Sequence, residues 1–388
     1  MPVKVAYIVE YPTPYDVPLF ERIAKRPEVD FTALFLSETI SQRGWKVDPA
    51  GRFPHKTIRG GRLFVSSNTQ FTAFFNPGVF RELVRGNYDV VGTSGYIPVT
   101  HYAVLAWCKA KGIPHFVRSE AVLPHARSAL KRAIKSVYLP YAVKTADSWL
   151  AAGTLAKKYL VHYGADPEKV FFLNYTIDDD AFETAVFEAR EKRDQMKRDL
   201  NITARSVVLF CGRLAPMKGL DTLMDAFAAV KRNGRDAALA FLGSGPLEAH
   251  LKKRVERESI SDVHFLGFHQ ADELPAFYGM ADMLVLPSVY EPWGIVVNEA
   301  QAASLPVVAS DVCGAAEDLV VDGETGFRFR SGDAKHLAEC IERVLENDAL
   351  RAKMGASGRK MVKDWGFDRS VDGFVKATLT AAGQSVKK

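Results

Sequence analysis

Residues 281–310 read ADMLVLPSVYEPWGIVVNEAQAASLPVVAS and show the pattern on which the rest of the chain is built. The continuously apolar run 283–287 is typical of a strand buried in a parallel sheet. A loop follows it, the spacing of 295–303 predicts a helix, and 306–309 is predicted as the next strand. The order strand, loop, helix and strand indicates a βαβ unit of an α/β fold.

This unit carries a carboxylate in its loop, Glu291, and a second one, Glu299, in the predicted helix. In open α/β sheets, ligands bind beyond the carboxyl ends of the strands, where helix N-termini present N–H groups. Gly294 allows the backbone to approach a ligand closely at that place. An anion joined to a polyhydroxyl group would suit this arrangement. An ordinary βαβ unit with a solvated Glu299 fits the spacing about equally well.

Length and composition exclude several classes of protein. A chain of 388 residues is expected to form two domains, since single cores stop growing at about 250–300 residues. The net charge of +5 is too small to argue for nucleic acid binding. Neither a signal-peptide pattern nor an 18-residue apolar run is present, which predicts a cytoplasmic protein that does not span a membrane. The cysteines are widely spaced and form no zinc or redox motif: Cys108, Cys211, Cys313 and Cys340.

Strand and helix signals alternate twice along the chain, which predicts an α/β protein with two Rossmann-like, doubly wound domains facing each other across a cleft. The first series of strands is expected between residues 3 and 173, with irregular structure or a hairpin over 41–76. The second series begins at 206–210. The expected boundaries are a first domain at 1–177, a charged linker with helical character at 178–204, a second domain at 205–365 and a terminal helix within 366–388.

A second motif opens the later series. Arg213 and Lys218 stand five residues apart in the loop after the strand 206–210, and Asp221 is predicted to cap the following helix. Arginine offers a forked donor and lysine a compact charge, so the two could clamp one diphosphate. An isolated pair of loop cations is more often simply solvated. The position at the carboxyl edge of a sheet favours the binding interpretation.

Short motifs that are individually weak follow one another through residues 206–365 in a characteristic order. As an ensemble they resemble the GT-B-fold retaining glycosyltransferases of family 4, while over 1–175 the resemblance is mainly one of strand and helix layout. The motifs are Gly212-Arg213…Lys218-Gly219, Gly243-Ser244-Gly245-Pro246, Leu266-Gly267, Ala281-Asp282, Pro287-Ser288, Glu291-Pro292-Trp293-Gly294…Glu299-Ala300, Pro306-Val307-Val308-Ala309-Ser310 and Glu324-Thr325-Gly326-Phe327.

The resemblance implies a nucleotide-sugar donor on the second domain and transfer with retention of configuration, without a metal or other cofactor. Arg213 and Lys218 would hold the donor diphosphate and, with Glu291 at the donor sugar, form the catalytic set. Glu299 would bind the ribose hydroxyls. The resemblance favours a UDP-sugar, with GDP-mannose second. The remaining donor-binding residues that it implies are Gly212, Leu266, Gly267, Phe268, Trp293, Gly294, Ile295 and Val296.

The first domain is expected to bind the acceptor, a saccharide or a lipid-linked saccharide, and the terminal helix to cross back to it. Two departures from the family pattern fall there. Residues 11–16 replace a Gly-Gly pair, and Arg118-Ser119-Glu120 stands where many members have a histidine. A lone histidine such as His101 is more often structural than functional. The candidate residues on the acceptor side are Tyr15, Asp16, His101 and Glu120.

Three other interpretations remain open at this stage. The run 178–180 (Asp-Asp-Asp) invites a metal site but matches the approach to the interdomain linker instead. A GT-B-like nucleotide-sugar epimerase would share the fold but lack the Arg213, Lys218, Glu291 and Glu299 set. A two-lobed solute-binding protein would need a secretory signal.

Residues 127–146 are predicted as a helix with a basic face beside aromatic and aliphatic side chains. Such a helix can rest on an anionic membrane, as the assembly of polysaccharide or lipopolysaccharide on a lipid would require. A solvated basic face is the alternative, slightly favoured by Pro140 within the helix. The basic residues are Arg127, Lys131, Arg132 and Lys135.

Overall fold

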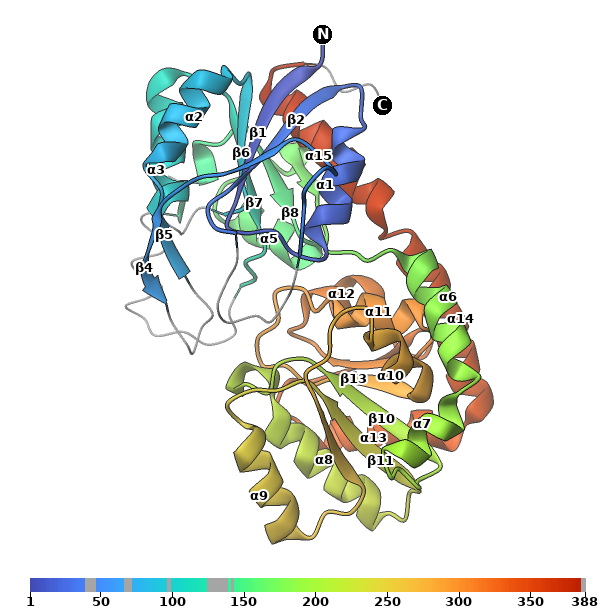
Figure 1. Ribbon diagram of the computed structural model, residues 1–388. Coiled ribbons are helices and arrows are strands. Elements are labelled where there is room, and N and C mark those ends of the chain that lie inside the picture. Colours follow the sequence, from blue (N-terminus) through green and yellow to red (C-terminus); the bar gives the residue numbers. More distant parts are fainter. Residues whose placement is uncertain (39–46, 66–71, 96–98, 124–138, 141–142, 385–388) are drawn as a thin grey trace. The chain divides into compact units, whose positions relative to one another are not determined.

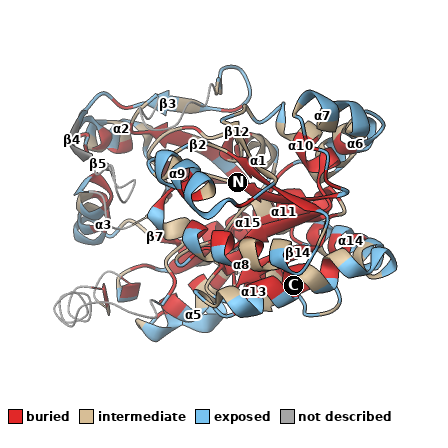
Figure 2. Ribbon diagram, turned by 90° about the horizontal axis from the view of Figure 1, so that it is seen from below, coloured by how far each residue is buried: buried red, intermediate tan, exposed pale blue. Residues whose placement is uncertain are grey.

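The computed structural model describes residues 1–38, 47–65, 72–95, 99–123, 139–140 and 143–384, with backbone alone at 62–65 and 72–73. The chain divides into two compact units. Unit 1 comprises Met1–Tyr175 with Phe367–Lys388, and unit 2 comprises Thr176–Gly366. In each unit a parallel sheet is covered by helices (Figure 1), and the buried residues concentrate in the strands and the inward helix faces (Figure 2). Two doubly wound α/β sheets were predicted, and they are confirmed.

In the described part of unit 1, the main sheet has seven strands in the order β3-β2-β1-β6-β7-β8-β9, and every neighbouring pair runs parallel. The chain order reverses between β1 and β6, which makes that junction the topological switch point. The strands are β1 (Val3–Val9), β2 (Val29–Phe35), β3 (His55–Thr57), β6 (Val90–Thr93), β7 (His115–Ser119), β8 (Ser148–Ala151) and β9 (Val170–Phe172).

The segment 41–76, for which irregular structure or a hairpin was expected, contains an antiparallel hairpin, β4 (Gly61–Val65) and β5 (Thr72–Phe75). Its short strand β3 also extends the main sheet, which the sequence did not indicate. The helix expected at 127–146 falls largely outside the described residues, and so do its four basic residues. The helices of unit 1 are α1 (Asp16–Ala24), α2 (Gly78–Gly86), α3 (Val99–Lys111), α5 (Thr154–His162), η1 (Pro167–Lys169) and α15 (Phe367–Ala381).

Helix α15 brings the end of the chain back into unit 1 (Figure 1). Its Phe374 is fully buried and meets Tyr7, Phe31 and Phe116 edge-on, with ring centroids 5.3, 5.5 and 5.3 Å away. A Cβ on Gly373 would lie 1.8 Å from the carbonyl oxygen of Phe172, so only glycine lets the helix lie this close to β9. The helix therefore completes the core of unit 1.

The sheet of unit 2 has six parallel strands in the order β12-β11-β10-β13-β14-β15, with its switch point between β10 and β13. Its strands are β10 (Ser206–Cys211), β11 (Ala237–Leu242), β12 (Val263–Gly267), β13 (Met283–Leu286), β14 (Val307–Ser310) and β15 (Gly326–Phe329). Its helices are α6 (Asp179–Arg190), α7 (Arg193–Asp199), η2 (Pro216–Lys218), α8 (Leu220–Arg232), α9 (Glu248–Glu258), α10 (Leu274–Met280), α11 (Val296–Ala302), α12 (Gly314–Leu319), α13 (Ala334–Glu346) and α14 (Asp348–Lys363).

The segment 178–204, which was expected to be a linker, is part of unit 2 and forms the helices α6 and α7. Phe182 of α6 packs edge-on against Tyr278, with ring centroids 5.4 Å apart. Arg193 of α7 forms an ion pair with Asp282 at 2.6 Å. The dense charge of this segment was the basis for the expected linker, but part of that charge is paired with the body of unit 2. Helices α12 and α14 and strand β15 are further elements that the sequence did not indicate.

We expect Phe374→Ala to destabilise unit 1 by about 3–5 kcal/mol, because it empties a fully buried site enclosed by three aromatic rings. Urea unfolding followed by tryptophan fluorescence and circular dichroism measures the change. The matched control is Lys376→Ala on the exposed side of the same helix, which should change stability by less than about 0.5 kcal/mol. Equal effects of the two substitutions would contradict the placement of α15.

Candidate functional site

The predicted donor-binding residues of unit 2 gather at the carboxyl edge of its sheet. After β10, the Gly212 N–H donates to the carbonyl oxygen of Leu242 at 2.9 Å, which ties this loop to the end of β11. The Gly243 N–H in turn donates to the Gly267 carbonyl at 2.7 Å, at the end of β12. Leu266 and Gly267 close β12, and Phe268 follows with 47% of its surface exposed. These strand ends form one continuous row beside the switch point.

Lys218 and Glu291 meet at the switch point from different loops. Lys218 ends η2, after β10, and its Nζ forms an ion pair with Glu291 of the loop after β13. Their side chains are only 18% and 12% exposed. The hydroxyl of Ser288 also donates to the same Glu291 oxygen at 3.0 Å. The structure thus brings together a cation and a carboxylate that lie 73 residues apart in the chain.

Backbone contacts hold the two loops that carry this pair. The Val289 N–H donates to the Met217 carbonyl at 2.9 Å. Gly219 lies between Lys218 and α8 with φ +64°, and a Cβ there would come within 2.1 Å of the Pro287 carbonyl oxygen. Arg213 is half-buried in the same loop as Lys218. The close backbone approach fixes the main chain next to Lys218, and with it the point from which the Lys218 side chain extends.

The other side of the Glu291 loop is fixed to the start of α12. The Gly314 N–H donates to the Glu291 carbonyl at 3.0 Å, and the Ala315 N–H donates to the Trp293 carbonyl at 2.8 Å. The Cys313 thiol donates to the same Trp293 oxygen at 3.0 Å. Burial raises the pKa of this thiol to about 12, so it stays a protonated donor. The loop is therefore anchored on both sides.

Trp293 supports the loop from inside the unit. Its side chain is 2% exposed, and its indole N–H donates to Asn298 Oδ1 at 3.0 Å. Its ring lies against Trp365, with centroids 5.6 Å apart. A side chain in this position offers almost no surface to a ligand. Its predicted contact with the donor therefore has to come from its backbone.

Glu299 is the buried carboxylate of the site. It is 2% exposed and lies in α11, where the Tyr278 hydroxyl donates to its Oε2 at 2.6 Å. Burial raises the pKa of Tyr278 well above its usual value, which keeps this phenol a donor. Gly294 precedes α11 with φ +96°, and a Cβ there would lie 2.9 Å from Leu286. Tyr278 was not singled out from the sequence, because it lies in a short helix without a motif.

The N-terminus of α11 follows the loop that carries Glu291, and Glu299 lies in the first turn of the same helix. The first hydrogen bond of the helix is donated by the Val297 N–H to the Gly294 carbonyl at 2.9 Å. The N–H groups of Gly294, Ile295 and Val296 precede it in the chain, at the position where a helix leaves its donors unsatisfied by its own carbonyls. Such donors suit the oxygens of a phosphate or a sugar.

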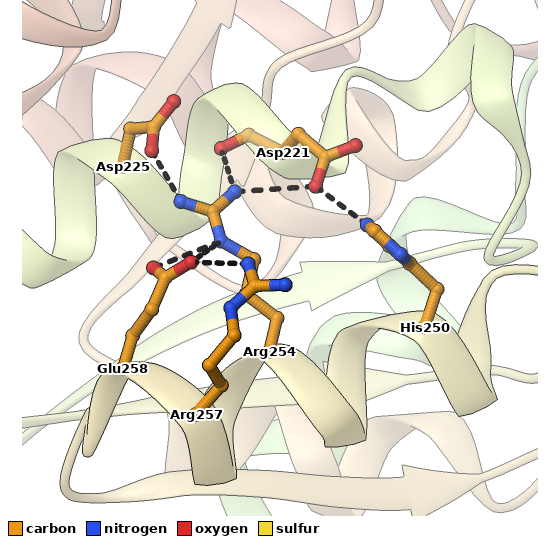
Figure 3. A network of polar contacts seen from close by, with 6 residues as sticks. All are labelled: Asp221, Asp225, His250, Arg254, Arg257 and Glu258. Carbon is orange, nitrogen blue, oxygen red and sulfur yellow. Dashed lines mark hydrogen bonds and ion pairs between the residues drawn. The ribbon is translucent and has the colours of Figure 1, made fainter.

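Asp221 does not cap α8 as was predicted. The helix begins at Leu220 with Gly219 in the cap position, and no side-chain cap bond is present there. Instead, the Asp221 carboxylate accepts hydrogen bonds from Arg254 at 3.1 Å and His250 at 3.0 Å, both on α9 (Figure 3). Burial would raise its pKa, but these hydrogen bonds hold the pKa of Asp221 below its usual value. The residue joins α8 to α9.

The acceptor-side candidates lie in unit 1. Tyr15 is half-buried before α1, while Asp16 at the start of α1 is buried, 3.7 Å from Arg118 Nη1. Glu120 follows β7, and its Oε1 lies 4.0 Å from Arg118 Nη2. His101 is fully buried in α3, and desolvation lowers its pKa. The structure thus joins Asp16 and Glu120 through Arg118, whose part in the cluster the sequence did not reveal.

The run 178–180 has structural partners. Asp178 accepts the Ala181 N–H at 3.2 Å and so caps α6. Asp180 forms an ion pair with Lys363 at 3.1 Å. Within the described part of the chain, no group of three or more His, Cys, Asp or Glu side chains is placed to hold a metal ion. Over the same residues, no helix is both long and apolar enough to cross a membrane.

Comparison with known proteins defines the class. Residues 192–361 match the family described as glycosyl transferases group 1. The chain is 30% identical over 337 residues to a D-inositol 3-phosphate glycosyltransferase of Salinispora tropica, a match that covers 80% of this chain and 68% of that protein. The chain therefore belongs to the group 1 glycosyltransferases.

Two further similarities concern one relative in sequence and one in fold. An alpha-D-kanosaminyltransferase of Streptomyces kanamyceticus is 34% identical over 188 residues, and this chain spans about half of it, 48%. The crystal structure of HepE from Anabaena in complex with UDP and glucose has a TM-score of 0.72 at 18% identity, covering 97% of this chain and 99% of that one. The GT-B fold that the sequence predicted is thereby confirmed.

We expect Gly219→Ala to destabilise unit 2 by roughly 2 kcal/mol or more beyond what Gly234→Ala does. Both glycines have positive φ, +64° and +77°, so alanine is strained by about 1–2 kcal/mol at either one. Only at Gly219 would the new Cβ also strike a carbonyl oxygen, since nothing lies within 4 Å at Gly234. Urea unfolding of the two variants compares them. Equal losses of stability would contradict the close approach.

Proposed function

We propose that this protein transfers a sugar from a nucleotide-diphosphate sugar to a saccharide acceptor, with retention of configuration and without a metal ion. The observation that carries the proposal is the meeting of Lys218, Glu291 and the start of α11 at the switch point of unit 2. Cations and N–H donors suit the diphosphate, and the carboxylates Glu291 and Glu299 suit sugar hydroxyls. The alternative of the same fold is a nucleotide-sugar epimerase. Such an enzyme would lack the set of Arg213, Lys218, Glu291 and Glu299.

The proposed roles are those that the family resemblance implies, and the positions of these residues at the sheet edge support them. Lys218 and Arg213 hold the diphosphate, and donor binding replaces part of the contact between Lys218 and Glu291 with contacts to phosphate and sugar. As the bond between the sugar and the diphosphate breaks, negative charge develops on the departing phosphate. Both cations, with the N–H groups at the start of α11, stabilise that charge. Glu299 binds the ribose, and Leu266, Gly267 and Phe268 contact the base through their backbone.

The proposed donor is a UDP-sugar, with GDP-mannose as the second candidate. The complex of HepE with UDP and glucose shares the fold and supports the first choice. The proposed acceptor is a saccharide, free or linked to a lipid. Contact with the inner face of a membrane through Arg127, Lys131, Arg132 and Lys135 stays a prediction, because these residues lie outside the described part of the chain.

We expect Lys218→Ala to lower turnover about 10²–10³-fold, the loss typical of removing one donor that acts on transition-state charge. Release of nucleoside diphosphate from UDP-sugars and GDP-mannose measures turnover. The control is Lys252→Ala on α9, which removes a half-exposed lysine that pairs with its helix neighbour Glu248 and lies over the Phe265 ring. Near-normal turnover in Lys218→Ala, with normal folding, would refute the proposed role of this lysine.

We expect UDP to raise the melting temperature of unit 2, and EDTA to leave this rise unchanged. A ligand at 100 times its Kd adds about 2.7 kcal/mol of stability. Glu299→Gln should weaken UDP binding about tenfold, because the carboxamide is a weaker acceptor for ribose hydroxyls yet still accepts from Tyr278. The exposed Glu256→Gln serves as control. Stabilisation by GDP but not by UDP would reverse the donor preference.

A further inference from the structure

The carboxyl edge of the unit 1 sheet has polar residues at three adjacent strand ends. Glu10 follows β1, Ser94 follows β6 and Glu120 follows β7. Since the strands lie in the order β1-β6-β7, the two glutamates flank Ser94. The β1–β6 junction is the switch point of this sheet, the place where open α/β sheets bind ligands. This row therefore stands at the position in unit 1 that corresponds to the donor site in unit 2.

Glu10 and Ser94 are joined to a buried histidine. The Ser94 hydroxyl donates to Glu10 Oε2 at 2.9 Å, and His101 Nε2 lies 3.4 Å from the same hydroxyl. His101 is fully buried, and its Nδ1 has no hydrogen-bond partner among the described residues. Burial lowers its pKa, so it adds no positive charge at neutral pH. Glu10 itself stays partly exposed.

Arg118 lies between the other carboxylates of this edge. Its side chain is 3% exposed, with Nη1 3.7 Å from Asp16 and Nη2 4.0 Å from Glu120. These are ion-pair distances that are too long for hydrogen bonds. Within the described chain, its Nε has no hydrogen-bond partner. Buried donors are normally hydrogen-bonded, so an unsatisfied one held between two carboxylates marks this guanidinium as a candidate for function.

Tyr175 fixes the geometry of the Arg118 cluster. The guanidinium of Arg118 lies over the Tyr175 ring, 4.3 Å from its centroid, and the Tyr175 hydroxyl donates to Glu120 Oε1. Glu120 remains about one-third exposed, with 36% of its side chain accessible. Desolvation raises its pKa even though Arg118 opposes the shift. The Glu120 side chain is therefore held in place while part of it stays exposed.

The charges of this edge do not cancel. Among the residues that the structure describes here, the carboxyls of Glu10, Asp16 and Glu120 outnumber the guanidinium of Arg118, which gives them an excess of acceptors and of negative charge. Sugar hydroxyls can donate to the carboxylates and accept from the guanidinium. An ammonium group is also attracted, whereas a carboxylate or phosphate is repelled.

We infer that Glu10, Arg118 and Glu120 bind the acceptor as an uncharged or amine-bearing saccharide and discriminate against acceptor rings that carry a carboxylate or phosphate. The inference rests on the proposed function, because it names the chemical class of the acceptor. Glu10 and Glu120 accept from hydroxyl or ammonium groups of the ring, and Arg118 donates to a ring hydroxyl oxygen.

The test compares four probes by ligand-observed NMR, in the presence of UDP: methyl glucoside, methyl glucosaminide, methyl glucuronide and glucose 6-phosphate. The wild type should bind the first two at least about tenfold more tightly than the two anions, as expected for an unscreened excess of negative charge. In the double variant Glu10→Gln/Glu120→Gln this ratio should fall to about twofold or less. The carboxamide oxygens still accept from Ser94 and Tyr175, so the positions are kept while the charge is lost.

The control variant is Glu168→Gln, which removes an exposed carboxylate of unit 1 and should leave the ratio unchanged. Anionic probes that bind the wild type as tightly as the neutral ones, an unchanged ratio in the double variant, or binding of none of the probes would overturn the inference. A melting-temperature rise with UDP is recorded on the same proteins. Stabilisation by a nucleotide without acceptor discrimination refutes only this inference, whereas the absence of stabilisation by UDP and GDP refutes the proposed function.

Discussion

Backbone packed directly against backbone is the constraint on which the unit 2 site depends. A Cβ on Gly219 would lie 2.1 Å from the Pro287 carbonyl, one on Gly243 2.1 Å from the Gly212 carbonyl, and one on Gly314 2.0 Å from the Pro292 carbonyl. Each contact joins loops that follow different strands. Because no side chain fits between them, the distance between the loops is fixed. The relative positions of the charged side chains on these loops are therefore fixed as well.

This constraint lets the site keep charged groups that are largely buried. Lys218 and Glu291 are paired, and Glu299 has the Tyr278 hydroxyl as a donor. A buried charge is costly unless it is paired or hydrogen-bonded, so the scaffold supplies these partners before any ligand arrives. The same groups match the chemistry of a nucleotide sugar. Under the proposed function, stability of the unliganded protein and recognition of the donor rest on the same contacts.

The two units use the same topology for different chemistry. Both place polar residues at the switch point of a parallel sheet, but in unit 2 a lysine is paired with a carboxylate beside N–H donors, whereas among the described residues of unit 1 carboxylates outnumber the one guanidinium. Helix α15 also gives unit 1 part of its core, including Phe374 between β-sheet aromatics. The core of unit 1 therefore depends on a segment that follows unit 2 in the chain.

The two parallel sheets, the family and the residues gathered at the edge of unit 2 could be predicted from the sequence. These are local signals: apolar strand runs, glycines in tight turns, and the motif around Glu291 and Glu299 all lie within a few residues of each other. The sequence did not indicate β3, β15 or α14, which are short or polar and are stabilised by neighbours. It also placed Asp221 as a cap, because a local pattern cannot show that Arg254 competes for its carboxylate.

Only the tertiary structure decided which distant residues meet. The pairing of Lys218 with Glu291, of Tyr278 with Glu299, and of Arg118 with Asp16 joins positions that are far apart in the chain, 73 and 21 residues for the first two pairs. The tertiary structure also places Trp293 inside unit 2, where it supports the Glu291 loop. Strand order and loop packing bring such residues together, and neither leaves a periodic signal in the chain, because the contacts form between elements and not within them.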